Sequence, residues 1–417
     1  MSARPSIDAR IRRYYVFDML VGFQIWTPFW TLWLLNHANE FQATLVDIVF
    51  WTTSLLLTIP AGAIADRYGR RPAILVGVAV WVSGIVLFGL ANSLPMFALG
   101  NAVWAIGAAF MWGTVSAYLY DTLAEAGMES RYPAITSRGT MLTFISAAAA
   151  APLGGYLVQV SGGLNLPLLV YALPGALALV VATTFPEPSV HRVPEANLVA
   201  QMRSGLRTTR GHPQIVLIIV FQILIGVVTY IIAFFRPLFI EEIVGGNFAL
   251  IGIAYGGFFC VAAAAGRSFD RLLDRFGESG ALWLTFFLVF PPMILVYAVS
   301  AGVFSSTAGI VAGVTSQIPY YVIWGFEGPI VTTIINRRVL SNDRATVLAI
   351  SIFFTTLSLA IFEPIVGYVV TVVGLGTSLA LLAAIAVVPS AYVIAAFRRS
   401  GAREIVPRPV PTGDHER

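Results

Sequence analysis

Apolar runs of about 20 residues recur along the whole chain, and short polar segments separate them. A helix of this length crosses the roughly 30 Å hydrocarbon core of a bilayer. The runs do not alternate apolar and polar residues as membrane β-strands do, so we expect helices, which satisfy their own backbone hydrogen bonds in lipid. Twelve spans are predicted, at about residues 14–35, 42–62, 73–91, 95–120, 134–160, 165–185, 213–238, 248–268, 280–300, 307–335, 345–372 and 376–397.

The composition supports an all-α membrane protein. Hydrophobic residues make up 58% of the 417 residues and charged residues only 11%, too few to cover the surface of a soluble domain of this size. The formal charge of +4 does not indicate nucleic-acid binding, because the 25 basic residues, all arginine, lie at the ends of the predicted spans. The single cysteine, Cys260, excludes an intrachain disulfide and argues against a metal cluster. We predict no cofactor, no metal and no cleaved signal peptide.

The arginines also predict the orientation in the membrane. They precede span 1, follow span 12, and occupy the connections after spans 2, 4, 6, 8 and 10. With twelve spans all of these sites fall on one face, and only Arg236 falls near the other. An excess of arginine in short loops marks the cytoplasmic side. We therefore predict a multi-pass protein of the inner or plasma membrane with both termini in the cytoplasm.

Three short patterns in the first half of the chain recur in the second half at nearly the same offset. They are Asp66-Arg-Tyr-Gly69 with Asp274-Arg-Phe-Gly277, Pro152-Leu-Gly-Gly155-Tyr156 with Pro364-Ile-Val-Gly367-Tyr368, and Gly113 eight residues before Asp121 with Gly328 eight residues before Asn336. These recurrences indicate a duplicated six-helix unit. Parallel halves of this kind meet around a central cavity near the middle of the membrane.

The repeat predicts two pseudo-symmetric six-helix bundles, at residues 1–185 and 213–397. A cytoplasmic linker at 186–212 joins them, and a cytoplasmic tail follows at 398–417. The linker is rich in proline and arginine and contains an amphipathic stretch, so we expect a solvated segment or a helix on the membrane surface.

The segment from Gly62 to Ile74 places one acid, three arginines and two glycines between two apolar runs. It resembles the signature of the major facilitator superfamily between spans 2 and 3. That signature reads glycine, three small or apolar residues, Asp-Arg, an aromatic or apolar residue, glycine and two basic residues. Six residues occupy its positions: Gly62, Asp66, Arg67, Gly69, Arg70 and Arg71. The resemblance extends over about 14–397 and implies twelve helices that transport a substrate by alternating access.

The resemblance implies that this cluster is a conformational latch, which holds the outward-facing state and breaks when the cytoplasmic side opens. Gly62 would allow a close helix approach, and Gly69 would allow a tight turn with positive φ. Asp66 can cap a helix N-terminus, and in this fold the expected recipient is span 11, near Arg344. Asp121, at the inner end of span 4, is either an arginine partner of the cluster or a simple helix-end acid. The alternative for the whole cluster is a topology anchor.

Two features bear on the direction of transport. Many drug/proton antiporters of the resembled family carry an arginine in span 4, four residues before a glycine, where this chain has Val103 before Gly107. Their glycine-rich, proline-containing pattern in span 5 is matched in part, since Pro152, Gly154 and Gly155 are present and alanines replace earlier glycines. The partial match in span 5 favours a bacterial transporter similar to drug and metabolite exporters.

Ionisable groups inside the bilayer are costly and mark functional sites. Four acids fall within the predicted spans, namely Asp18, Asp47, Glu327 and Glu363. Glu327 lies near mid-depth, and we expect the Gly-Pro pair that follows it to break span 10. Asp47 is predicted near the outer face in reach of water, and Asp18 is close enough to the membrane edge to pair with an arginine. We predict proton coupling at Glu327, Glu363 or Asp18, with buried carboxyls bonded to hydroxyls or arginines as the alternative.

Spans 1, 4, 7 and 10 line the cavity in the resembled family, and here they are rich in aromatic and amide side chains. The predicted cavity residues are Gln24, Trp26, Trp30, Asn101, Trp112, Gln222, Tyr230, Gln317, Tyr320, Tyr321 and Trp324. Such a wall suits a flat or amphipathic organic molecule, held by ring stacking and a few hydrogen bonds. The alternative is that these rings face lipid. Arg236 either lies near the cavity or forms a salt bridge with Glu241 or Glu242.

The first hypothesis for the function is a proton-coupled exporter of small organic compounds. The second is an uptake symporter or uniporter of the same fold, and the third is a non-transporting membrane sensor or scaffold. Polar cavity residues and broken spans argue against the third. We find no nucleotide-binding loop or catalytic constellation in the sequence, which argues against an ATP-driven pump or an enzyme. The expected partners are a small organic substrate, protons and the lipid bilayer, and the protein is predicted to act as a monomer.

Overall fold

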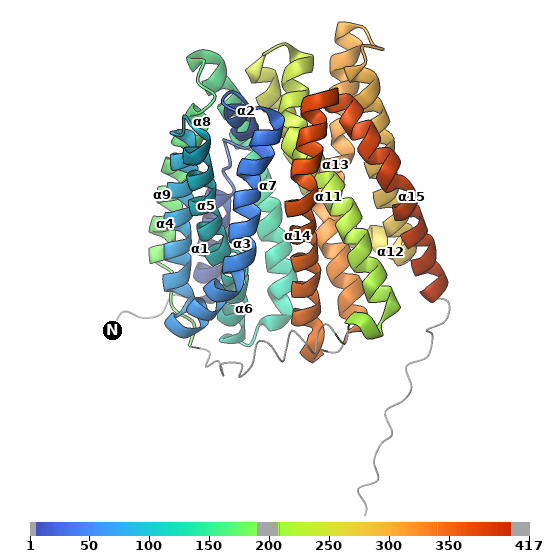
Figure 1. Ribbon diagram of the computed structural model, residues 1–417. Coiled ribbons are helices and arrows are strands. Elements are labelled where there is room, and N and C mark those ends of the chain that lie inside the picture. The colour runs from blue at the N-terminus through green and yellow to red at the C-terminus, as the bar shows by residue number, and fades with distance from the viewer. Residues whose placement is uncertain (1–5, 190–206, 208, 340, 402–417) are drawn as a thin grey trace, which may run out of the picture.

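The computed structural model describes residues 6–189, 207, 209–339 and 341–401, and every regular element within them is helical. The helices stand side by side along a common direction (Figure 1). They are α1 (Ile7–Val21), α2 (Trp30–Leu35), α3 (Glu40–Tyr68), α4 (Arg70–Gly89), α5 (Leu94–Met111), α6 (Thr114–Ala124), the 3-10 turn η1 (Glu129–Arg131), α7 (Tyr132–Ser161), α8 (Leu166–Val170), α9 (Ala172–Thr183), α11 (Pro213–Val244), α12 (Phe248–Ser300), α13 (Ser306–Arg338), α14 (Ser341–Val373) and α15 (Leu375–Gly401).

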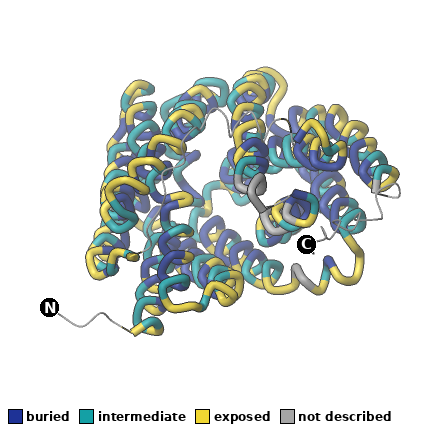
Figure 2. The backbone as a smooth tube through the Cα atoms, turned by 90° about the horizontal axis from the view of Figure 1, so that it is seen from below, coloured by how far each residue is buried: buried dark blue, intermediate teal, exposed yellow. Residues whose placement is uncertain are grey.

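The helix ends define two faces of the molecule. The end at the bottom of Figure 1 holds the start of α1, the turn between α3 and α4, and residues 185–189 after α9, and we call it the linker face. The opposite end, the far face, holds the turns between α4 and α5 and between α11 and α12. Seen from the linker face, buried residues lie inside the bundle and exposed residues lie along its outside (Figure 2). Many of the exposed side chains are large and apolar, such as Leu56, Val160 and Ile385, which fits a surface covered by lipid.

Ten helical segments of the described chain are long and apolar enough to cross a membrane. Two of them belong to α12, which bends at Gly277, where the backbone is not helical (φ 65°, ψ 179°). The other two predicted spans correspond to α1 with α2 and to α13. The described residues therefore fit the predicted twelve-span arrangement.

Three spans predicted as continuous are interrupted. In span 1, α1 ends at Val21 and α2 begins only at Trp30. In span 4, α5 and α6 are separated at Gly113, whose φ of 75° cannot continue a right-handed helix. In span 6, α8 and α9 meet at Tyr171. The breaks in spans 1 and 4 lie beside the cavity described below.

The break predicted in span 10 is wrong. The backbone of α13 stays helical from Ser306 to Arg338, through the Gly-Pro pair, and α14 continues through Pro364. Proline is tolerated inside membrane helices because neighbouring helices and local adjustments satisfy the freed carbonyl groups.

The repeat seen in the sequence also appears in the backbone. Gly69, between α3 and α4, and Gly277, within α12, both have positive φ, at 107° and 65°. In each turn an arginine lies over the neighbouring aromatic ring, with Arg67 at 5.5 Å and Arg275 at 5.6 Å from the ring centroid. Glycine is the residue that adopts such φ values without strain, so each half requires its glycine for the same turn.

Two helix pairs bring the halves together near the far face. A Cβ on Gly155 of α7 would lie 2.5 Å from the carbonyl oxygen of Phe248 and 2.9 Å from Cα of Gly252, both in α12. A Cβ on Gly367 of α14 would overlap the hydroxyl of Thr44 in α3. Because these contacts leave no space between the backbones, they close the far face between α7 and α12 and between α14 and α3.

Candidate functional site

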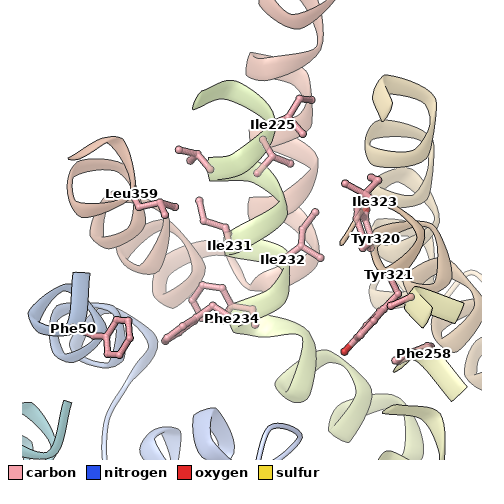
Figure 3. Close-up of a cluster of buried hydrophobic side chains, with 14 of the residues drawn as sticks. Phe50, Ile225, Ile231, Ile232, Phe234, Phe258, Tyr320, Tyr321, Ile323 and Leu359 are labelled. Atoms are coloured by element: carbon pink, nitrogen blue, oxygen red, sulfur yellow. The ribbon is translucent and has the colours of Figure 1, made fainter. Parts of the chain in front are cut away.

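A cavity of about 550 Å³ lies between the two halves. One wall comes from residues 24–30, α3, α4 and α5, and the other comes from α11, α12, α13 and α14. Figure 3 shows part of the packing around it, with Phe50 and Phe234 on one side and Tyr321 near Phe258 on the other. The predicted cavity residues that line it are Gln24, Trp26, Trp30, Asn101, Trp112, Tyr230, Tyr320, Tyr321 and Trp324.

Two predicted cavity residues are placed elsewhere. The side-chain oxygen of Gln222 accepts a hydrogen bond from Ser351 of α14 and is not part of the lining. Gln317 is buried behind the lining, where its Oε1 accepts a hydrogen bond from Arg236. Both amide side chains are therefore hydrogen-bonded to residues of the half of the molecule that contains α11 to α15.

The aromatic wall is built around Trp104. Its ring makes edge-to-face contacts with Trp26 at 4.7 Å, Phe50 at 5.6 Å and Trp30 at 6.1 Å. Edge-to-face pairs add to the energy of burial and fix the ring orientations, so this wall presents a rigid apolar surface. Trp112 and Trp324 also line the cavity but are 47% and 50% exposed, so the cavity is accessible beside these two rings.

Two carboxyl groups from different halves meet at the cavity wall. Asp47 of α3 lines the cavity and is 3% exposed, and its Oδ2 accepts hydrogen bonds from Trp51 Nε1 at 3.1 Å and from the hydroxyl of Tyr230. Glu363 of α14 is fully buried behind it, against Asp47 and Tyr230, and neither carboxyl oxygen of Glu363 makes a well-formed hydrogen bond in the described chain. Asp47 was expected to reach water at the outer face, but α14 and α11 cover it there, and it faces the cavity instead.

The two other candidate acids differ from Glu363 in their surroundings. Asp18 lies between α1 and α7, where a Cβ on Gly139 would be 2.8 Å from its Oδ2 and the hydroxyl of Tyr14 is its hydrogen-bond partner. It does not line the cavity. Glu327 belongs to α13, but its side chain lies outside the described residues.

Arg236 of α11 is a buried cation in the cavity lining, with 5% of its surface exposed. Its Nε donates to Oε1 of Gln317 at 3.2 Å, and its guanidinium carbon lies 4.6 Å from the ring centroid of Tyr321. Of the two alternatives for Arg236, the structure has the position at the cavity, and Arg236 forms no salt bridge with Glu241 or Glu242.

The predicted latch cluster lies on the linker face. Arg70 contacts two acids, with its NH2 group 2.7 Å from Asp66 Oδ1 and its Nε 3.5 Å from Asp121 Oδ2. The arginine partner expected for Asp121 is thus Arg70. Arg71 donates from NH2 to the carbonyl oxygen of Thr183 at 2.6 Å, so it ties α4 to the end of α9. The side chain of Arg344, the expected recipient region for Asp66, lies outside the described residues.

Gly62 does not make the close contact expected of it. No described atom lies within 4 Å of the position that a Cβ on Gly62 would take. Gly69 does have the predicted positive φ, and a Cβ there would lie 2.8 Å from Oε1 of Glu187. Because Gly69 has no side chain, the carboxylate of Glu187 can reach the start of α4.

Glu187, in the segment that follows α9, caps α4. Its Oε1 accepts from the backbone N–H of Arg70 at 2.5 Å and its Oε2 from that of Arg71 at 2.8 Å. The first N–H groups of a helix have no partner within the helix, and the helix dipole favours a negative charge there. This cap was not predicted from the sequence, in which Asp66 was expected to cap span 11 and no residue was assigned to the start of α4.

Glu125, just after α6, holds the same segment. Arg10 NH1 donates to Glu125 Oε2 at 2.7 Å, and the backbone N–H of Ser189 donates to Oε1 at 2.7 Å. Burial raises the pKa of Glu125, but the hydrogen bonds from Ser189 and Arg10 outweigh it and lower the pKa to about 2. The carboxylate therefore stays ionised at neutral pH, and its stabilising effect is lost only as the pH falls from about the usual glutamate range toward 2.

Replacing Glu187 by Ala is expected to lower the stability of the protein by about 1 kcal/mol, because two helix N–H groups lose their acceptor. The measurement is the midpoint of thermal unfolding in detergent, which should fall relative to the wild type. Glu129→Ala removes an exposed carboxylate from η1 on the same face and serves as the matched control. Equal midpoints for the two variants would contradict the capping role.

The family model of the Major Facilitator Superfamily matches residues 16–362. The chain belongs to this superfamily. Multidrug resistance protein 1 of Bacillus subtilis (strain 168) is 25% identical to it over 327 residues, which cover 76% of this chain and 77% of the relative. The sialic acid transporter NanX of Escherichia coli (strain K12) is 27% identical over 176 residues, 42% of each chain.

Solved structures of Major Facilitator Superfamily transporters share the fold. A D-xylose-proton symporter superposes with a TM-score of 0.73 at 13% identity, covering 93% of this chain and 97% of the other. The nucleoside transporter NupG superposes with a TM-score of 0.71 at 14% identity, covering 95% and 99%. This superfamily member is therefore a multi-pass membrane protein of the secondary-transporter kind and not an enzyme.

Proposed function

We propose that this Major Facilitator Superfamily member is a proton-coupled exporter of small organic compounds, acting as a monomer in the cytoplasmic membrane of a bacterium. The linker face, where the arginine-rich connections lie, faces the cytoplasm. Bundles 1–185 and 213–397 move against each other around the cavity, with 186–212 as a cytoplasmic linker and 398–417 as a cytoplasmic tail. The match to multidrug resistance protein 1 over 76% of the chain supports export.

The observation that carries proton coupling is the contact of Asp47 with Glu363 across the two halves. Two carboxyl groups in one buried site cannot both carry a negative charge, so one carboxyl of such a pair is protonated. Asp47 faces the cavity and Glu363 is sealed behind it. Asp47 is thus the entry point for the proton, and Tyr230 orients its carboxylate.

The charge of this pair depends on the arrangement of the bundles. When the halves rock apart between α3 and α14, water reaches both carboxyls and the like charges separate. Proton release is then coupled to the same motion that exposes the substrate. Neither Glu327 nor Asp18 has a described contact across the halves, so we assign the main role to Glu363 and Asp47.

We further propose that the linker-face cluster acts as the conformational latch. Arg70 bridges the acids Asp66 and Asp121. Gly69 makes the turn, Gly62 and Arg67 complete the family signature, and Arg71 fixes α4 to α9. In the outward-facing state the cluster would hold the cytoplasmic ends of the helices together. It would rearrange when these ends separate.

Uptake is the second candidate function, since the similar proteins include a sialic acid transporter and a D-xylose-proton symporter. Flux in inverted membrane vesicles distinguishes the two directions. Under the export proposal, compounds accumulate inside inverted vesicles when the lumen is acidified, and the accumulation collapses when a protonophore removes the gradient. Accumulation only in right-side-out vesicles would assign uptake instead.

A further inference from the structure

Arg236 has no counter-charge within the described part of the chain. It lies in the last third of the membrane-spanning helix α11, toward the far face, and is 5% exposed. Its described partners are all neutral: the amide of Gln317, the ring and hydroxyl of Tyr321, and the hydroxyl of Tyr255. Glu241 and Glu242, on the same helix, form no ion pair with it.

A guanidinium stays protonated at any physiological pH. Burying it without an opposite charge is costly, and charged residues held within a membrane-spanning bundle mark substrate or ion pathways. A neutral amide, two tyrosine hydroxyls and one aromatic face offset only part of that cost. We therefore expect Arg236 to bind an anion that is not part of the described chain.

Asp47, the acid in the cavity lining, lies in a different part of the cavity from Arg236. Asp47 contacts Tyr230, which precedes Arg236 by six residues on α11, so the two sites are separated by about 9 Å along the helix axis at 1.5 Å per residue. Asp47 is already bonded to Tyr230 and Trp51. It does not neutralise Arg236.

The aromatic wall that faces Arg236 contains hydrogen-bond donors without acceptors. The indole N–H groups of Trp26 and Trp104 are buried and have no hydrogen-bond partner in the described chain. Both residues line the cavity. A cavity with one cation, two unpaired donors and a rigid aromatic wall complements an acceptor-rich anion with a flat apolar body.

We propose that Arg236 binds the carboxylate of an aromatic organic anion, whose ring system packs against Trp26, Trp30 and Trp104. The inference rests on the proposed transport function and specifies its substrate class. A planar guanidinium matches a carboxylate in a two-point contact. It carries five N–H donors, of which Nε–H is bonded to Gln317, while Tyr255 and Tyr321 offer one hydroxyl each, so terminal N–H groups remain for the substrate.

Equilibrium binding to the purified full chain in detergent tests the inference by calorimetry. The probes are phenylacetate, 1-naphthaleneacetate and 4-biphenylacetate, each compared with its primary amide, which has the same ring and no charge. We expect at least one carboxylate to bind about tenfold more tightly than its amide. Arg236→Gln should remove that preference, so that the carboxylate binds no more tightly than its amide, and Arg236→Lys should keep part of the preference.

Arg399→Gln, at the exposed end of α15, removes one positive charge far from the cavity and should change nothing. The carboxylate-to-amide comparison in the wild type needs no variant, so it decides the matter even where Arg236→Gln does not fold. Wild-type binding that never favours a carboxylate, or an Arg236→Gln variant that keeps the preference, would overturn the inference.

This result is distinguishable from failure of the transport proposal. The binding measurement uses no proton gradient, so a loss of proton coupling would leave the preference for carboxylates intact. Proton-driven export of neutral compounds alone, with no carboxylate preference in binding, would overturn the substrate class and leave the proposed function standing.

Discussion

Replacing Glu363 by Gln is expected to abolish proton-driven accumulation of substrate, with a fall of at least about a hundredfold, or about 2.7 kcal/mol in transition-state terms. The amide keeps the size of the side chain but cannot exchange a proton with Asp47. Asp47→Asn should have the same effect, and the double variant should be no worse, because the two carboxyls act as one site. The measurement is flux into proteoliposomes with an imposed pH gradient.

Substrate exchange at equal concentrations and without a gradient separates a coupling defect from misfolding. We expect both variants to retain exchange, because exchange requires no net proton movement. Glu129→Gln, an exposed acid on the linker face, is the matched control and should keep full proton-driven flux. If Glu363→Gln and Asp47→Asn both accumulate substrate as well as the control does, proton coupling resides elsewhere.

The sequence predicted Glu363 as a candidate but missed its partner. The depth of a residue along a helix can be counted from the helix end, and by that count Asp47 lies near the far face. Its burial depends on α11 and α14, which come from the other half of the chain, and its hydrogen bond to Tyr230 spans 183 positions. Contacts between halves depend on how two bundles pack, which the periodicity of apolar residues does not encode.

Replacing Gly252 by Leu is expected to prevent closure of the far face and to reduce transport by at least about a hundredfold. A Cβ at Gly252 would already lie 2.5 Å from the carbonyl oxygen of Ala151 and 2.9 Å from Cα of Gly155. Since that clash involves backbone atoms of α7, a side-chain rotation cannot relieve it, and the two helices must separate. The expected result is a population shifted toward conformers with an open far face.

Spin labels at the exposed positions Val160 and Val303, in a Cys260→Ser background, measure the distance between the halves at the far face. The distance should increase in Gly252→Leu. Gly257→Leu is the matched control, because Gly257 lies in the same helix and a Cβ there meets no described atom within 4 Å. An unchanged distance and normal flux in Gly252→Leu would show that this contact does not govern closure.

The spans were predictable, and several of the local deviations were not. Runs of apolar residues located the membrane-crossing segments, and Gly69 was correctly expected to form a turn. The sequence rule that proline breaks a helix failed at α13, because packing against other helices compensates for the lost hydrogen bond. The capping role of Glu187 was missed because it arises from a segment 117 positions away from the helix that it caps.

Seven of the nine tryptophans of the chain line the one cavity: Trp26, Trp30, Trp51, Trp81, Trp104, Trp112 and Trp324. The ultraviolet emission of the whole protein therefore originates mainly from the walls of a single volume, and its wavelength depends on the water within that volume. Filling or draining the cavity should change the spectrum of the unlabelled protein. Intrinsic tryptophan fluorescence should therefore report binding in the cavity. Unknown compounds can be screened by this signal without dyes, mutations or a radioactive ligand.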